Sequence, residues 1–385
     1  MNTKTSLLAT AATVALFSAA NGQAVIDITG STAGRATVHN QILSLLSGES
    51  FAWYMVNGNT QTNAASADAV IYKGGTLGGI SVTVRTFWAG SASGVDFVSN
   101  QVLLDNKFFA TSVTTANAQI TGDQAALQLA GQLAPASAET ASEFGFSDVK
   151  QAATLHQANP LAEQTDMFVI PFRWLCTETL IGVTNITDQM ARTHFTAGGE
   201  TKKSLFTGVA GDALTLVYAV GRDSDSGTRI TTFAETGAGV FTPLTQWGFT
   251  TTGTGAAVTI SLPAELFDGG YASGGSVGTI LGGSGFSAIG YVGISDATAA
   301  TGNGAVALNF NGVPFSVENV KNGSYTFWSK YQAIRKQTLS GTAASLFGSL
   351  KTALVALPTQ GSGSSIKLTD MAVSRQSDGG DVIPK

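Results

Sequence analysis

The chain has few of the residues that catalysis and metal binding usually require. Its 385 residues include one cysteine, Cys176, and three histidines, His39, His156 and His194. A single cysteine excludes a disulfide framework, and the dispersed histidines show no ligand spacing of a zinc site. The sequence also lacks a Gly-x-x-x-x-Gly-Lys-Ser/Thr phosphate loop. We therefore expect neither a metal nor another cofactor.

One motif does match an enzymatic pattern. The run GGSVG, Gly274 to Gly278, fits the Gly-x-Ser-x-Gly motif of a nucleophilic serine. In hydrolases with this motif the base histidine follows the serine, whereas all three histidines here precede Ser276. We interpret the match as chance in a chain rich in glycine and serine, and predict that the protein is not an enzyme.

Charged residues are scarce, at 12% of the chain, and the net charge is −5. Such a chain has no basic surface for nucleic acid or for an anionic membrane. The hydrophobic content of 43% is enough for a large core, and the length suits two domains better than one. We expect a globular protein with two domains and no nucleic-acid partner.

A long apolar run occurs only at the N-terminus. Lys4 precedes the run SLLATAATVALFSAA, and the small residues of ANGQA offer cleavage after Gly22 or Ala24. This pattern predicts a signal peptide over residues 1–24 rather than a buried helix. No later run approaches the about 20 residues that span a bilayer, and Cys176 lies far from the cleavage region, where a lipid anchor would need it. We predict a free periplasmic protein.

Strand-like and helix-like runs alternate along the mature chain. AVIDITGS is followed by TVHNQILSLLSG, a helical pattern that Gly48 would stop. The order recurs at GGISVTVRTFWAGSASG, at MFVIPFRWL before NITDQMARTHF, at DALTLVYAVGRDSDSGTRITTFAE and at FSAIGYVGIS, which predicts an α/β fold. In NITDQMARTHF, Thr187 would cap a helix with Met190, His194 and Phe195 on one face, and a packing role is expected for His194.

Three stretches do not fit this alternation. Residues 111–142 and 248–262 have low complexity, and both are predicted to be surface insertions outside the site. The C-terminal residues 361–385 are rich in glycine and serine and are expected to be loosely ordered.

Polar clusters follow several of the apolar runs. Ligands of open α/β sheets bind at the strand ends, where a helix that begins there points free backbone N–H groups at an anion. In the cluster RDSDSGT, Ser226, Gly227 and Thr228 would open a helix through RITTFAE while Arg222 binds two oxygens of an anion. Ordinary helix capping is the alternative. The four clusters are TGSTA (29–33), GSASG (90–94), FSD (146–148) and RDSDSGT (222–228).

GRDSDSGTRITTF resembles the Arg-x-x-x-Ser-Gly-Thr segment of phosphate-binding proteins, the periplasmic receptors of phosphate ABC transporters. Further segments are similar in the same order: ITGSTA, GSASGV, FSDV, ITDQMARTHFTAGG, SAIGYVGIS and LNFNGVPFSVENVKNGSYTFW. Together they cover most of the mature chain in scattered blocks. The resemblance implies a type II periplasmic binding-protein fold, in which two α/β lobes, each a mixed sheet flanked by helices, enclose a ligand cleft. It also implies a monomer whose partner is an inner-membrane ABC permease.

The resemblance further implies how the chain divides. Lobe 1 would comprise residues 25–168 and 304–385, and lobe 2 residues 169–303. The hinges would lie near Thr165–Pro171 and near Thr298–Gly304.

Carried over motif by motif, the resemblance implies a phosphate site shared by both lobes. Either Ser31 or Thr32 would present its hydroxyl, and Ser93 competes with Ser91 for the same role. Arg35 departs from the family, in which an aromatic or aliphatic residue is common at this position. The implied site residues are Ser31, Thr32, Ala33, Ser91 and Asp148 from lobe 1, and Arg222, Ser226, Gly227 and Thr228 from lobe 2.

Asp148 would make this site selective. Phosphate keeps at least one proton at neutral pH, which an ionised carboxylate accepts in a hydrogen bond, whereas sulfate has no such proton. A mismatch of this kind discriminates by roughly 10⁴ when a site is built for the missing group. Alternatively, Asp148 caps a helix that runs into VKQAATL.

We therefore predict an exported solute-binding protein that captures inorganic phosphate between its lobes and delivers it to a permease. The alternative is an exported interaction or matrix protein that keeps the fold but has lost or changed the ligand, which the Gly/Thr-rich insertion favours.

Overall fold

A mixed β-sheet runs through the whole molecule. The computed structural model describes residues 23–252, 259–260 and 263–385. Nearly all of the predicted signal peptide, and most of the insertion expected at 248–262, therefore lie outside the described residues. Two short strands, β16 (Val306–Ala307) and β19 (Ile366–Lys367), also pair with β7. In spatial order the other strands are β5 (Ala118–Gln119), β2 (Ser50–Tyr54), β3 (Ala69–Leu77), β4 (Ile80–Trp88), β1 (Ala24–Gly30), β6 (Phe144–Ser147), β18 (Trp328–Arg335), β7 (Glu163–Cys176), β15 (Ala288–Gly293), β10 (Leu216–Val220) and β9 (Glu200–Lys202).

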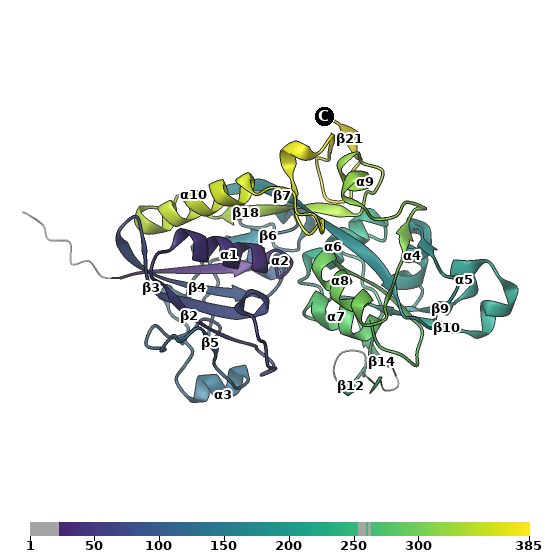
Figure 1. Cartoon of the computed structure of the whole chain (residues 1–385), viewed down its shortest axis with the longest axis horizontal. Helices are drawn as coiled ribbons and strands as arrows, with labels where there is room; N and C mark the ends of the chain where they lie inside the picture. The colour runs from purple at the N-terminus through teal and green to yellow at the C-terminus, as the bar shows by residue number, and fades with distance from the viewer. Residues whose placement is uncertain (1–22, 253–258, 261–262) are drawn as a thin grey trace, which may run out of the picture.

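Strand β7 is shared by the two halves of the molecule. Its first part, through Pro171, pairs antiparallel with β18, and its last part, from Phe172, pairs antiparallel with β15. The run MFVIPFRWLC is almost entirely buried, as expected for a strand covered on both faces. Figure 1 shows the two lobes side by side, with β7 and β18 running between them.

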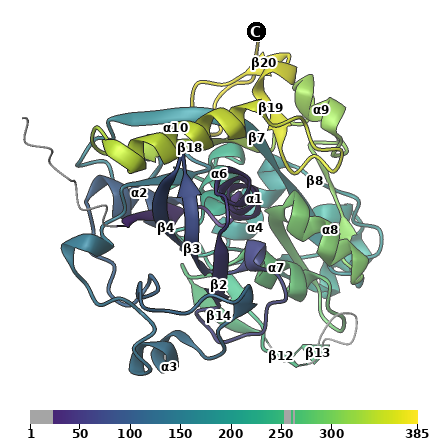
Figure 2. The same ribbon diagram turned by 60° about the vertical axis from the view of Figure 1, so that its left-hand side comes forward.

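The first lobe is built around β1, which lies parallel to β4 on one side and to β6 on the other. Helices α1 (Arg35–Leu45) and α10 (Gly341–Ala356) pack together over one face, where Val38 and Ile42 join Leu346 and Leu350 in the main core. Figure 2 shows α10 lying along this lobe. Helix α2 (Ser91–Ser99) packs against β6 and β1.

Residues 111–142 were predicted to be a surface insertion, and this is wrong for part of the segment. Val113, Leu127 and Leu133 are buried against β2 and β3 in a second hydrophobic core of the first lobe. Leu127 lies on the short helix α3 (Gln124–Leu129). The segment therefore completes the lobe, because these side chains cover a sheet face that would otherwise meet water.

The second lobe is built on the parallel pair β10 and β15, with β9 at the edge. Helix α4 (Asp188–Thr196) begins as predicted, since Thr187 Oγ1 accepts a hydrogen bond of 3.1 Å from the N–H of Met190. His194 is buried, and its Nδ1 lies 2.8 Å from Thr201 Oγ1, which confirms a packing role. The remaining helices of this lobe are α5 (Ser204–Thr207), α6 (Gly227–Glu235), α7 (Gly274–Leu281) and α8 (Ile294–Gly302).

The C-terminal segment 361–385 is not loosely ordered as predicted. Strand β19 adds to β7, and β20 (Val373–Ser374) pairs with β21 (Ile383–Pro384). Between these two strands, Asp378 accepts hydrogen bonds from the N–H of Lys150 at 2.8 Å and from Ser329 Oγ at 3.2 Å. Polar contacts with residues far away in the sequence therefore order a segment whose own composition favours disorder.

Candidate functional site

Three polar clusters of the first lobe lie at one edge of its sheet. The clusters follow β1, β4 and β6, which are parallel neighbours and therefore end on the same side. The N–H of Ser31 donates to the carbonyl of Phe146 at 2.9 Å, and the N–H of Gly90 donates to the carbonyl of Gly30 at 3.2 Å. These backbone bonds hold the three loops together, as the α/β pattern predicts.

Ser91 and Asp148 are neighbours at this edge of the sheet. Ser91 opens α2, and its Oγ accepts a hydrogen bond of 3.1 Å from the N–H of Asp148. Both residues are buried. The geometry favours Ser91 over Ser93 as the serine of the site.

Helix α6 approaches this edge from the second lobe. Ser226 caps the helix with its Oγ, which accepts from the N–H of Arg229 at 3.3 Å, so the predicted helix start is confirmed. Gly227 lies directly against the first lobe. A Cβ at this position would overlap the Asp148 carboxylate and would lie 2.5 Å from Ser91 Oγ. The free N–H groups and the positive dipole end of α6 therefore face the Asp148 side chain.

Arg222 brings a buried positive charge to the same place. Its Nε donates to the carbonyl of Tyr271 at 3.0 Å, and its Nη2 donates to the carbonyl of Ala272 at 2.8 Å. Across the lobe boundary, Nη2 also lies 3.4 Å from Thr32 Oγ1. No carboxylate in the described part of the chain forms an ion pair with Arg222, and its guanidinium is bound by two carbonyl groups and lies near the Thr32 hydroxyl.

The Asp148 carboxylate is fully buried, and neither of its oxygens has a hydrogen-bond partner among the described residues. Burial raises the pKa of this carboxyl to about 6, and the nearby Ser31 hydroxyl and Arg222 charge oppose that rise only in part. The capping alternative is wrong, because the chain beyond Asp148 forms only a short 3₁₀ turn, Gln151–Ala153, and Asp148 caps no helix. A buried, unpartnered carboxylate is rare enough to require an explanation.

The two hydroxyls of the first loop have different surroundings. Ser31 Oγ accepts a hydrogen bond of 3.1 Å from the N–H of Ala33 and so closes the turn. Thr32 faces Arg222. Arg35, the departure from the family pattern, forms an ion pair of 3.2 Å with Asp68 at the edge of the cleft.

Direct contacts hold the lobes together around the site. The N–H of Ala92 donates to the carbonyl of Asp225 at 2.9 Å. Beside this bond, Ala92 and Val149 of the first lobe pack against Ile230 of the second in a small apolar cluster of their own. Each of these residues lies close in sequence to a predicted site residue. The two lobes are therefore in direct contact at the site, and the structure is closed in this sense.

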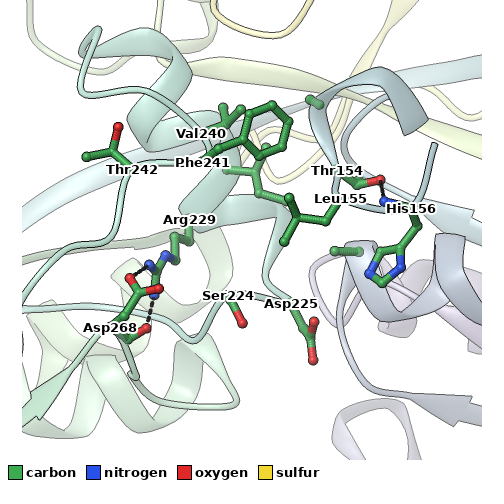
Figure 3. A pocket seen from close by; sticks show the side chains of 13 residues that line it. Thr154, Leu155, His156, Ser224, Asp225, Arg229, Val240, Phe241, Thr242 and Asp268 are labelled. Atoms are coloured by element: carbon green, nitrogen blue, oxygen red, sulfur yellow. Dashed lines mark hydrogen bonds and ion pairs between the residues drawn. The ribbon is translucent and has the colours of Figure 1, made fainter. Parts of the chain in front are cut away.

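A cavity of about 90 Å³ beside the closed site is lined by Thr32 and Ala33. Two others flank the site. The larger, of about 520 Å³, lies between the lobes and is lined by Arg35, Asp68 and Trp88 on one side and by Ala272 and Asp296 on the other. The smaller, of about 100 Å³, is a crevice between Leu155 and Phe241. Figure 3 shows that Arg229, which lines this crevice, is bound to Asp268. The crevice therefore offers no free arginine, whereas the larger cavity is lined by Ala272, whose carbonyl accepts a hydrogen bond from Arg222.

The serine of the Gly-x-Ser-x-Gly match lies on α7. Ser276 lies in the first turn of α7, where its Oγ is 2.9 Å from that of Ser273. Within residues 23–252, 259–260 and 263–385, no group of three or more His, Cys, Asp or Glu side chains is placed to hold a metal ion. Over the same residues, no helix has the length and apolar character needed to cross a membrane.

The site also contains residues that sequence reasoning missed. Tyr271 and Ala272 hold the Arg222 guanidinium through their carbonyl groups, and Gln246 donates to the Arg222 carbonyl at 2.9 Å. Backbone carbonyls have no signature in a sequence. The closeness of Gln246 to Arg222 arises from tertiary packing, so no local signal could have found it.

Comparison with known proteins identifies the fold. No protein-family model matches the sequence. No curated protein matches it either. Among solved structures, the chain is similar to a protein assigned as a phosphate ABC transporter substrate-binding protein from Clostridium perfringens, solved with bound phosphate, at 16% identity and a TM-score of 0.50. That match covers 89% of this chain and 99% of the other.

Two further structures are similar over comparable lengths. An ABC-type phosphate transport receptor from Vibrio cholerae matches at 12% identity and a TM-score of 0.45, over 89% of this chain and 99% of that one. PstS from Borrelia burgdorferi matches at 15% identity and a TM-score of 0.40, over 86% and 93%. The first similarity carries the conclusion by itself: the chain has the predicted two-lobed α/β fold, which it shares with that structure, with a mixed sheet flanked by helices.

Proposed function

We propose that the protein is an exported receptor that binds inorganic phosphate between its lobes and releases it to a membrane permease. The observation that carries the proposal is the meeting of Asp148, Arg222 and the start of α6 in one buried place. A buried carboxylate without a partner beside a buried arginine without a carboxylate suits a ligand that is both anionic and protonated.

The proposed recognition divides between the groups of the site. Arg222 and the N–H groups at the start of α6 would bind unprotonated phosphate oxygens, with the Ser91 and Thr32 hydroxyls beside them. Asp148, whose pKa is about 6 in this structure, is mostly ionised at pH 7 and would accept the phosphate proton in a hydrogen bond. Sulfate would leave the Asp148 carboxylate buried, unpaired and repelled.

Entry of the anion requires the lobes to separate. Gly227 lies against Asp148, and the Ala92 to Asp225 bond closes the site beside them. We propose that the lobes open about the strands that join them, with the anion entering through the cavity beside Ala272, and that the permease recognises the closed form.

Calorimetric titration of the mature chain, residues 25–385, tests this proposal. The chain is first stripped of bound anion by partial unfolding and refolding, and is then titrated with phosphate and with sulfate. We expect saturable phosphate binding near one site per chain and no heat of binding from sulfate. No heat of binding from either anion would contradict the proposal and favour an exported interaction or matrix protein with the same fold.

Two variants separate the roles of the charged groups. Asp148→Asn is expected to bind sulfate, because an amide donates a hydrogen bond where the carboxylate repels the anion. Arg222→Lys keeps the charge but loses the planar pair of donors, so we expect about tenfold weaker phosphate binding with unchanged selectivity. Unchanged selectivity in Asp148→Asn would remove Asp148 from the site.

A further inference from the structure

Strand β18 places a buried hydroxyl beside the candidate site. Tyr331 is fully buried, and its hydroxyl has no hydrogen-bond partner among the described residues. Buried hydroxyl groups of tyrosine normally find a partner, because leaving one unpaired costs free energy. The position of this hydroxyl therefore needs a physical reason.

The register of the sheet makes Tyr331 the neighbour of Asp148. In the antiparallel pairing of β18 with β6, Ala333 lies opposite Phe146 and Gln332 opposite Ser147. Strand β6 ends at Ser147, and one further step along both chains leads to Tyr331 and Asp148, whose side chains we therefore expect on the same face. Ser329 Oγ donates to the carbonyl of Asp148, which shows that β18 continues alongside this residue.

The Tyr331 ring also lies under the loop that carries Ser31 and Thr32. A Cβ at Gly34 would overlap Cζ of Tyr331, the ring carbon that bears the hydroxyl. The ring is stacked between Phe146, with centroids 5.9 Å apart, and Phe168, with centroids 4.9 Å apart. These contacts fix the hydroxyl in place between the first loop and Asp148.

Tyr331 and Asp148 have complementary needs. The hydroxyl can donate and the carboxylate can accept, yet among the described residues neither has a hydrogen-bond partner and the two are not bonded to each other. A protonated phosphate oxygen satisfies both groups at once, because a P–OH group donates one hydrogen bond and accepts others.

We propose that Tyr331 is a further ligand-binding residue, whose hydroxyl donates to the same protonated oxygen that donates to Asp148. This inference rests on the proposed function and narrows it: the site recognises a tetrahedral oxyanion by its P–OH group, through one donor and one acceptor. No proton is transferred between the anion and the protein in the bound state, so binding requires no other reactant.

Tyr331→Phe, compared with Tyr325→Phe, tests the inference. Tyr325 is an equally buried tyrosine of the same region, but its hydroxyl donates to the carbonyl of Phe172 at 2.8 Å. The measurements are phosphate titration by calorimetry and the thermal midpoint of the anion-free, full mature chain.

We expect opposite results from the two variants. Tyr331→Phe removes an unpaired hydroxyl, so the thermal midpoint of the anion-free protein should stay or rise while phosphate affinity falls about tenfold. Tyr325→Phe leaves the carbonyl of Phe172 without its partner, so the midpoint should fall while phosphate affinity is unchanged.

Two outcomes overturn the inference. If Tyr331→Phe binds phosphate as tightly as the wild type, the hydroxyl does not touch the anion. If it loses stability and affinity together, as a packing defect would cause, Tyr331 is structural. Silence of the wild type itself towards phosphate would instead overturn the proposed function, which distinguishes the two failures.

Discussion

The carboxyl group of Asp148 is buried away from water, and its burial lowers the free energy of unfolding by an amount that depends on pH. Burial raises its pKa to about 6 from an ordinary 3.8. The folded chain therefore binds the proton more tightly than the unfolded chain, and the resulting stability is complete below pH 3.8 and is lost as pH rises through 6. From this group alone, the anion-free protein should lose up to about 3 kcal/mol of unfolding free energy between pH 4 and pH 7.

The variant Asp148→Asn isolates this contribution, since every other carboxyl titrates in both proteins. We expect the anion-free variant to be the more stable protein at pH 7, with an advantage that shrinks as the pH falls towards 4. Urea unfolding of both proteins at several pH values measures the difference. An advantage that is constant with pH would show that the Asp148 carboxyl has an ordinary pKa.

Among the single residues of the candidate site, the sequence predicts some and misses others. Asp148, Arg222 and Ser226 follow apolar runs in polar clusters, and the resemblance selects them among similar residues. Tyr331 has no such signal. Its neighbour Asp148 is far away in the sequence, and only the pairing of β18 with β6 brings the two together.

The start of α6 is the element on which the closed site depends. Gly227→Ala adds a methyl group that would overlap the Asp148 carboxylate, so the lobes should not close fully. Overpacking of this kind costs about 1 to 3 kcal/mol, which corresponds to roughly 5- to 150-fold weaker phosphate binding. Titration of the variant with phosphate measures the loss.

Gly348→Ala is the matched control for this change. Gly348 lies within α10, away from the site, where a Cβ would have no other atom within 4 Å. Alanine favours a helix over glycine by about 1 kcal/mol, so the control should gain stability and keep its phosphate affinity. Equal affinity losses in both variants would mean that the crowding at Gly227 is not the cause.

Helix starts were predictable because their signals are local. Thr187 and Ser226 each cap the expected helix. In both cases the side-chain oxygen accepts a hydrogen bond from the backbone N–H three residues later. The order in residues 111–142 and 361–385 was not predictable. Both segments are stabilised by contacts with distant strands, and composition reports only what a segment does by itself.

The positions of the lobe boundaries depend on how strands from the whole chain pair. The first expected hinge, Thr165–Pro171, lies within β7, the strand that passes between the lobes. For the second, we propose a position later than Thr298–Gly304. Strand β16 pairs with the last part of β7, and β17 (Asn309–Phe310) pairs with β8 (Asn185–Ile186), so the chain is still among second-lobe strands there. It then returns to the first lobe in β18.

A strap from the C-terminal segment, residues 375–379, contacts both lobes. Arg375 forms a buried ion pair of 2.8 Å with Glu235, at the end of α6, and its guanidinium lies 4.1 Å from the ring centroid of Trp328 in β18. Asp378 binds the N–H of Lys150 in the first lobe. The strap therefore connects the helix that begins at the site to the loop that carries Asp148.

Glu235→Gln should loosen this connection, because it leaves the buried Arg375 charge without its partner. Breaking a buried pair costs about 3 to 5 kcal/mol, and the part of that cost borne by the closed form lowers its population. We expect a larger radius of gyration in small-angle scattering without phosphate, and about tenfold weaker phosphate binding. Glu318→Gln, which removes an exposed pair of 3.6 Å with Lys321, should change neither. Lower stability of Glu235→Gln with unchanged size and affinity would mean that the strap stabilises the fold without favouring closure.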